Sequence, residues 1–159
     1  MEYLWSPWRM EYILNEKRKD CVFCTALESS HDSENLVVAR GRLNFVILNR
    51  YPYSSGHLMV VPMAHIGALE ELDAETRGEM MELASHALHV LREEYRPHGF
   101  NLGINEGSAA GAGIHEHLHL HVVPRWNGDT NFMSSLAGTR VLPEPLEDTL
   151  QRLARRWNL

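Results

Sequence analysis

Four histidines alternate along the segment His115-Glu-His-Leu-His-Leu-His121, which continues as Val-Val-Pro. Alternate residues of a β-strand share one face at a spacing of about 6.6 to 6.8 Å. A strand over residues 117–123 would therefore line one side with imidazoles, while Leu118, Leu120 and Val122 enter the core and fix the register. Imidazole can bind a metal ion, move a proton or attack phosphorus near neutral pH.

Three interpretations of this histidine-rich strand compete. The strand could simply face solvent, or it could belong to a dinuclear metallohydrolase. Such metal sites commonly add a carboxylate within or just beyond the His-x-His motif, whereas Val122 and its neighbours are aliphatic. The third interpretation is phosphorus chemistry, because an imidazole held in one tautomer is a good nucleophile and neighbouring histidines can donate protons to phosphoryl oxygens. The residues favour this third interpretation.

The composition limits the range of functions. The 159 residues and the 44% apolar content suit one globular core. The net charge of −6, from 15 basic and 21 acidic residues, argues against a nucleic-acid polymer as the partner. No apolar run approaches the roughly 20 residues needed to cross a bilayer, and the first residues lack the features of a secretory signal. We therefore expect a cytoplasmic protein with no membrane partner.

Short apolar segments bounded by turn residues predict a mainly antiparallel, five-stranded sheet. Residues 36–39 and 45–48 form a predicted hairpin, and a third strand runs over residues 57–61. A fourth strand is expected over residues 100–105, and the histidine strand is the fifth. Because strands joined by hairpins are flanked by separate helices, we expect an α+β fold.

Three helices are predicted around this sheet. Ser6 followed by proline predicts a short N-terminal helix that ends near Ile13. The major helix is capped by Asp73 and stops before Pro97, and its apolar residues recur at three- and four-residue spacing. A terminal amphipathic helix places four apolar residues on one face. These are Leu146, Leu150, Leu153 and Trp157.

The histidine strand closely resembles a known family. His117-Leu-His-Leu-His121-Val-Val matches the His-x-His-x-His-x-x motif of the histidine-triad (HIT) family, in which x is apolar. Residues 48–62, which include Asn-Arg-Tyr-Pro-Tyr, resemble the ribose-binding strand and the fourth histidine of that family. The resemblance implies a HIT-like fold with a major helix and a C-terminal helix.

The resemblance also sets the expected extent of the domain. It covers about residues 21–126 and implies one HIT-like domain over residues 1–159, with an N-terminal arm over 1–20 and a C-terminal extension over 127–159. Residues 124–133 and the terminal helix are similar to the branch of bacterial diadenosine tetraphosphate phosphorylases.

The resemblance implies a role for each histidine of the motif. His119 corresponds to the nucleophile, which attacks the α-phosphorus of a nucleotide and forms a covalent nucleotidyl-histidine. A backbone carbonyl would accept the Nδ1 hydrogen of His119 and leave Nε2 free to attack. His121 would contact the α-phosphate or the leaving oxygen. His57, with His117 as the first histidine of the triad, would complete the catalytic set.

Asn49 and a glycine-rich loop are the expected substrate-binding elements. The resemblance places Asn49 at the ribose hydroxyls. Glycines in the loop over residues 105–113 let backbone N–H groups approach a phosphate closely. Its candidate contacts are Asn105, Gly107, Ser108 and Gly113. The family commonly carries a hydroxyl residue where this chain has Gly113 and Ile114, and Ser108 is a candidate replacement.

Cys21 and Cys24 form the Cys-x-x-Cys half of a tetrahedral zinc site, although the same pair could be ordinary reduced thiols. Zinc-bearing HIT proteins and the related galactose-1-phosphate uridylyltransferases imply His65 and His117 as the remaining ligands. His115 is expected on the same strand face and is a rival fourth ligand. A closed four-ligand site would be structural and would align the nucleophile.

These residues predict an enzyme that cleaves dinucleoside polyphosphates, with structural zinc and no organic cofactor. Transfer of the nucleotidyl group to orthophosphate would be phosphorolysis, and transfer to water would be hydrolysis. The resemblance favours phosphorolysis of diadenosine tetraphosphate to ATP and ADP. A nucleoside phosphoramidate hydrolase and a non-catalytic nucleotide-binding module are the alternatives. The resemblance also implies adenine nucleotides as substrates and a homodimer.

Overall fold

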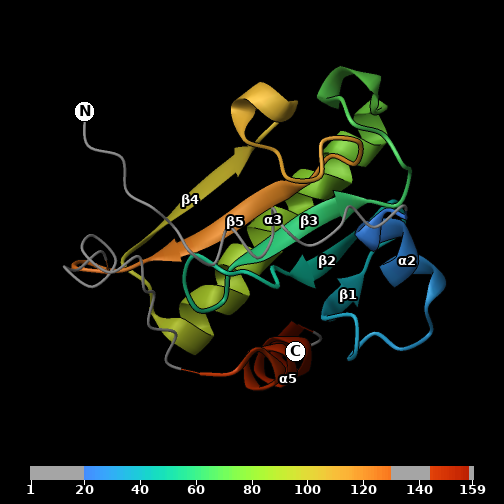
Figure 1. Ribbon diagram of the computed structural model, residues 1–159. Helices are drawn as coiled ribbons and strands as arrows, with labels where there is room; N and C mark the ends of the chain where they lie inside the picture. The colour runs from blue at the N-terminus through green and yellow to red at the C-terminus, as the bar shows by residue number, and fades with distance from the viewer. Residues whose placement is uncertain (1–19, 130–143, 158–159) are drawn as a thin grey trace.

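The computed structural model describes residues 20–129 and 144–157, and its strands form one five-stranded antiparallel sheet in the order β1-β2-β3-β5-β4 (Figure 1). The strands are Val37–Arg40 (β1), Asn44–Leu48 (β2), Leu58–Pro62 (β3), Gly99–Ile104 (β4) and Leu120–Arg125 (β5). The helices are Val22–Glu28 (α2), Ala74–Tyr95 (α3) and Leu146–Trp157 (α5), with short 3-10 turns at Leu69–Glu71 (η1) and Ser108–Ala110 (η2). This arrangement confirms the predicted α+β fold, whereas the helix predicted from Ser6 lies outside the described residues.

The pairing of β3 with β5 separates a core face from a functional face. Leu58 lies opposite Val122 in the antiparallel register, and both side chains are fully buried. The next pair, Met59 opposite His121, points to the other side because successive strand residues alternate. Helix α3 packs against β2, β3 and β5 and covers the core face (Figure 1). His121 therefore projects from the face that α3 leaves uncovered.

Helix α3 follows the predicted pattern. Asp73 caps its first turn by accepting a 2.7 Å hydrogen bond from the amide of Thr76, and the helix ends at Arg96 in the left-handed conformation before Pro97. Its buried positions recur at the spacing of one helical face. They are Thr76, Met80, Ala84, Ala87, Val90 and Leu91.

Strand β5 begins at Leu120, three residues later than the predicted start at 117. The amide of Leu118 donates to the carbonyl of Ile66 at 2.8 Å, so this part of the chain bonds to the loop after β3 rather than to a neighbouring strand. The prediction that the imidazoles share one face of a single strand is therefore wrong, because only His121 of these histidines lies in β5. His117 is fully buried, whereas the side chain of His115 is 51% exposed.

Two further helices hold the edge of the sheet at β1. Helix α2 was not predicted from the sequence. The carbonyls of Ala26 and Leu27 near its end each accept a 3.1 Å hydrogen bond from the Arg40 guanidinium. The predicted terminal helix is confirmed as α5, which packs against α3 and β1 and buries Leu153. Within the described residues, no helix combines the length and the apolar composition needed to span a membrane.

Candidate active site and metal centre

His57 is positioned by the turn that leads into β3. Gly56 precedes it in a left-handed conformation with φ of 77°, and a Cβ at this glycine would lie only 2.8 Å from the side chain of Leu91. The His57 side chain is 1% exposed, and its Nδ1 accepts a 3.0 Å hydrogen bond from the amide of Tyr53. The Tyr53 ring stacks on the imidazole, with centroids 4.9 Å apart. Both position and tautomer of His57 are therefore fixed by this turn.

His121 lies beside His57 on the neighbouring strand. Its Nδ1 is 3.0 Å from Nε2 of His57. Because Nδ1 of His57 already accepts from Tyr53, its hydrogen lies on Nε2 and is donated to His121. Burial, with a contribution from His119, lowers the pKa of His121 to about 4. A neutral His121 therefore carries its own hydrogen on Nε2.

His119 is held with one nitrogen bonded to the backbone. Its Nδ1 donates to the carbonyl oxygen of His117 at 2.9 Å, which leaves the lone pair on Nε2. The ring centroid lies 4.8 Å from that of His121, and the residue is 5% exposed. Burial lowers the pKa of His119, so the imidazole is neutral and nucleophilic near pH 7. This is the tautomer that attack through Nε2 requires.

His117 faces away from this pair, toward the cysteines. Its Nε2 donates to the carbonyl of Pro62 at 2.8 Å, so Nδ1 carries the lone pair. That Nδ1 lies 3.3 Å from Sγ of Cys21 and 3.7 Å from Sγ of Cys24. Burial lowers the pKa of His117, and the neighbouring His65 and His119 act in the same direction. A neutral imidazole with an inward lone pair is suited to metal ligation.

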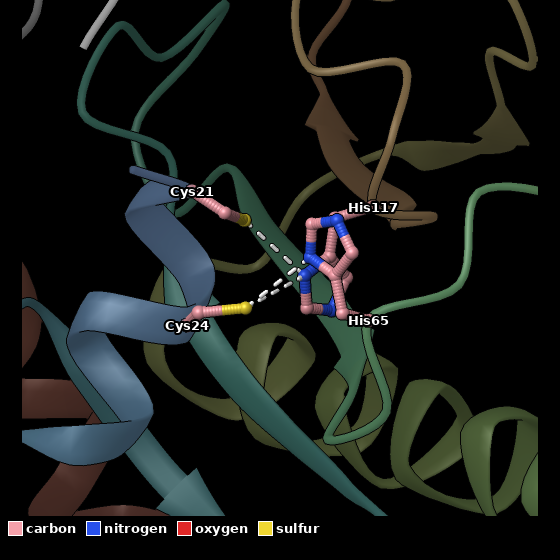
Figure 2. Close-up of side chains that lie close together, drawn as sticks. All are labelled: Cys21, Cys24, His65 and His117. Atoms are coloured by element: carbon pink, nitrogen blue, oxygen red, sulfur yellow. Dashed lines mark hydrogen bonds between the residues drawn. The ribbon is translucent and has the colours of Figure 1, made fainter. Parts of the chain in front are cut away.

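Cys21, Cys24, His65 and His117 form a four-residue cluster whose ligand atoms all lie within 4.8 Å of one another. Figure 2 shows the two cysteines of the α2 segment pointing toward the two imidazoles, and Nδ1 of His65 lies 3.3 Å from Sγ of Cys24. Two sulfurs and two nitrogens form a donor set of structural zinc, in which Zn–S bonds of about 2.3 Å and Zn–N bonds of about 2.0 Å hold the ligands this close. The residues therefore fit a zinc ion.

The cluster contains only one of the two candidate fourth ligands. His117 belongs to it, whereas the exposed His115 lies outside it. Burial and the adjacent Cys21 raise the pKa of the Cys24 thiol to about 11 in the metal-free protein. A bound cation would stabilise the thiolate and displace this proton.

Asn49 lies directly beside the histidines. It follows β2, and its amide donates to the carbonyl of His57 at 3.0 Å. Its side-chain oxygen accepts from the amide of Tyr51 at 2.9 Å, and Nδ2 lies 3.7 Å from the sulfur of Met59, the strand partner of His121. Asn49 therefore borders the face that carries His121.

The loop after β4 has the conformation of a glycine-dependent turn. Gly107 and Gly111 have φ of 76° and 86° and flank η2, which begins at Ser108. Ser108 and Gly113 are exposed, and Gly113 is not among the glycines with positive φ. The loop emerges next to the site because Gly103 pairs with His121, yet no hydrogen bond joins Asn105, Gly107, Ser108 or Gly113 to the histidines within the described residues.

Sequence reasoning missed Phe23, which lies between the two cysteines. Its ring centroid is 5.3 Å from that of His117 and 5.2 Å from that of His119. The apolar residue inside the Cys-x-x-Cys motif was the available signal. Tyr53 was also missed, because its contribution to His57 comes from a backbone amide that side-chain patterns do not reveal.

Residues 30–128, which carry the sheet and the histidines of the candidate active site, match the family model described as the HIT domain. The chain therefore belongs to the histidine-triad family.

Three similar proteins agree with this assignment. An AP-4-A phosphorylase of Mycobacterium tuberculosis is 42% identical over 165 residues, which covers 99% of this chain and 85% of the relative. A zinc-bound histidine triad family protein from Mycobacterium smegmatis is 29% identical, with a TM-score of 0.69 over 87% of this chain and 94% of that protein. A hypothetical histidine triad nucleotide-binding protein from Sulfolobus tokodaii has the same TM-score at 25% identity and covers 87% and 92%.

Proposed function

We propose that this protein is a nucleotidyl transferase that converts diadenosine tetraphosphate and orthophosphate into ATP and ADP through a nucleotidyl-His119 intermediate. The observation that carries the proposal is the bond from Nδ1 of His119 to the carbonyl of His117, because it leaves a buried, unprotonated Nε2. The 42% identity to an AP-4-A phosphorylase supports the choice of substrate.

In the first half-reaction, Nε2 of His119 attacks the α-phosphorus of the bound dinucleotide. The N–P bond forms as the bridging P–O bond breaks, and the electron pair leaves with ATP. The imidazole becomes positively charged and keeps its Nδ1 hydrogen on the carbonyl of His117. In the second half-reaction, an orthophosphate oxygen attacks the same phosphorus, the N–P bond breaks, and ADP departs.

The remaining site residues bind and orient the substrate in this proposal. His121 donates its Nε2 hydrogen to a phosphoryl oxygen, and His57 holds His121 in the tautomer that can do so. Asn49 binds the ribose hydroxyls beside them. Asn105, Gly107, Ser108 and Gly113 are the proposed contacts to the polyphosphate.

We also propose that Cys21, Cys24, His65 and His117 hold a structural zinc ion. When bound, zinc supplies a cross-link between α2 and the chain before β5, with no position left for substrate. One of these four ligands, His117, also accepts a hydrogen bond from Nδ1 of His119 through its backbone carbonyl. The zinc-bound relative from Mycobacterium smegmatis supports this assignment.

A cytoplasmic homodimer joined along β4 is the proposed assembly. Within the described residues, β4 has β5 as its single sheet neighbour, and an unpaired strand edge is a ready pairing surface. Leu102 on this edge is 41% exposed. Light scattering should give a dimer that Leu102→Lys converts to monomer, whereas Leu69→Lys, at an exposed leucine on η1, should leave it intact.

The deciding experiment incubates the protein with diadenosine tetraphosphate, with and without orthophosphate, and separates the nucleotides by chromatography. ATP plus ADP that forms only with phosphate supports phosphorolysis, and phosphate-independent AMP plus ATP supports hydrolysis. His119→Asn should abolish turnover while nucleotide binding persists. If neither condition gives turnover, the proposal is wrong, and cleavage of adenosine 5′-phosphoramidate distinguishes the phosphoramidate hydrolase from a binding module.

A further inference from the structure

A directional chain of hydrogen bonds runs from the backbone at Tyr53 through His57 to His121. The first bond joins the Tyr53 amide to Nδ1 of His57 at 3.0 Å, and the second joins Nε2 of His57 to Nδ1 of His121 at 3.0 Å. A peptide N–H can only donate, so Nδ1 of His57 must accept. Each later donor and acceptor in the chain is thereby determined, and the last group is the Nε2 hydrogen of His121.

This chain opposes a positive charge on either imidazole. An imidazolium carries hydrogens on both nitrogens. A second hydrogen on His121 would have to lie on Nδ1, where it would face the Nε2 hydrogen of His57 at 3.0 Å. A second hydrogen on His57 would lie on Nδ1 and face the amide hydrogen of Tyr53. Protonation therefore requires that one of these bonds be broken.

The surroundings of the His57–His121 pair also oppose a positive charge on either imidazole. His57 is almost completely buried, and burial, with His119, lowers the pKa of His121 to about 4. Two titratable side chains of the described residues have rings that contact the pair: His119 contacts His121, and Tyr53 stacks on His57. The Nδ1 hydrogen of His119 is donated to the carbonyl of His117 and Nε2 carries the lone pair, so His119 has no hydrogen to give to His121.

From this geometry we propose that the His57–His121 pair donates a hydrogen bond to the reacting phosphate but transfers no proton. The site then selects for departing groups that leave as anions and for acceptors that attack as anions. Polyphosphates meet the first condition and orthophosphate meets the second. This inference rests on the proposed function and specifies its substrate class.

The balance of atoms explains the selection. When the P–O bond to ATP breaks, the oxygen retains the electron pair and is stable as a phosphate anion, so no proton is needed. An alkoxide, a poorly stabilised phenoxide or an amine must gain a proton as it departs. The neutral pair could give the Nε2 hydrogen of His121 only by taking on a negative charge, either on His121 or, after transfer of the shared hydrogen, on His57. Water must lose a proton as it attacks the nucleotidyl-histidine, whereas an orthophosphate oxygen is already negatively charged.

The test uses aryl esters of adenosine 5′-monophosphate that differ only in the phenol, from 4-nitrophenol through 4-chlorophenol to phenol. Single-turnover formation of adenylyl-enzyme is measured for each ester. Because general acid catalysis contributes roughly 10²- to 10⁴-fold, its absence predicts that the phenyl ester reacts more slowly than the 4-nitrophenyl ester by at least about 100-fold. Rates that differ by less than about tenfold would show proton transfer to the leaving group and overturn the inference.

This experiment separates the inference from the function on which it rests. If no ester gives a covalent adenylyl-enzyme, the nucleotidyl-histidine mechanism fails. If the intermediate forms at nearly equal rates with all three esters, that mechanism stands and the inference fails.

A pair of variants tests the role of the Tyr53 amide. Tyr53→Pro removes the N–H that fixes His57, whereas Tyr53→Ala removes the ring and retains the N–H. The alanine variant should keep the steep dependence on the leaving group, and the proline variant should flatten it by about tenfold or more because the pair can now be protonated. Equal slopes in both variants would contradict the assigned role of the amide. If circular dichroism shows that Tyr53→Pro is unfolded, the ester series on the unmodified protein decides alone.

Discussion

The carbonyl oxygen of His117 accepts the Nδ1 hydrogen of His119 at 2.9 Å, while the side chain of His117 directs its own Nδ1 at Sγ of Cys21 from 3.3 Å. One residue thus belongs to both the thiol–imidazole cluster and the support of the candidate nucleophile. A change in the cluster that moves His117 must also move the acceptor that sets the tautomer of His119. The thiol–imidazole cluster and the candidate nucleophile His119 are therefore mechanically coupled.

Phe23 provides a second link between the two centres. Its ring contacts both imidazoles, at 5.3 Å from His117 and 5.2 Å from His119. Phe23→Leu should slow adenylyl-enzyme formation and lower the unfolding free energy by about 1 to 3 kcal/mol, while zinc content stays the same. Phe45→Leu is the matched control, because this buried ring contacts Phe23 at 6.5 Å and no imidazole among the described residues. Equal slowing in both variants would indicate a general packing defect.

Removal of a cluster ligand should release the metal. His65→Ala should reduce zinc affinity by more than the roughly 10- to 100-fold that follows loss of an outer-shell partner, and it should lower the melting temperature. His115→Ala should change neither quantity, because His115 is exposed and lies outside the cluster. Metal analysis and thermal unfolding, each with and without a chelator, measure the two effects. Zinc loss in His115→Ala would instead indicate that His115 is the fourth ligand.

The elements predicted from the sequence are those whose signals are local. Helix α3 carries its own cap at Asp73 and a regular apolar face. The apolar alternation in the histidine segment correctly indicates that Leu118, Leu120 and Val122 are buried, but it does not show that His117 and His119 are buried as well. The late start of the fifth strand, at Leu120 instead of residue 117, has a non-local cause. The amide of Leu118 bonds to Ile66, 52 positions earlier in the chain.

The candidate site was predictable only where family resemblance or side-chain type revealed it. The cysteines and histidines of the cluster were all named from the sequence, but α2 was not, because its seven residues have no side-chain cap and depend on distant partners. The groups that fix the histidine tautomers belong to the backbone: the amide of Tyr53 donates to His57, and the carbonyls of Pro62 and His117 accept from His117 and His119. Backbone groups occur at every position, so sequence patterns do not identify them.

Arg40 should be the residue that holds α2 and its cysteines against the sheet. Its guanidinium donates to the carbonyls of Ala26 and Leu27 and forms a salt bridge with Asp32 at 2.7 Å. Arg40→Met should lower the unfolding free energy by about 1 to 3 kcal/mol and weaken zinc binding. The matched control is Arg42→Met, which removes a more exposed arginine paired with Glu75 and should change stability by about 0.5 kcal/mol or less. Unchanged zinc affinity in Arg40→Met would separate α2 docking from metal binding.

Glu79 should make the stability of the protein depend on pH. Burial works to raise the pKa of this carboxyl, but the hydrogen bonds donated by the Asn44 side chain and by the amides of residues 42–44 prevail and hold the pKa below its usual value. A lowered folded-state pKa contributes stability above the unfolded pKa of about 4.3. That stability is lost as the pH falls through the folded-state pKa.

The glutamine variant tests this linkage. Glu79→Gln keeps the shape but removes the charge, so its unfolding free energy should be lower by about 1 to 3 kcal/mol at pH 7. The difference from the unmodified protein should shrink as the pH falls below the unfolded pKa of about 4.3 and through the lowered folded-state pKa, where the carboxylate becomes protonated. Urea unfolding at a series of pH values measures both quantities. Glu75→Gln, at an exposed carboxylate of the same helix, should change the pH dependence much less, because charges that face solvent are screened. A constant difference across the pH range would mean that Glu79 stabilises the turn through shape alone.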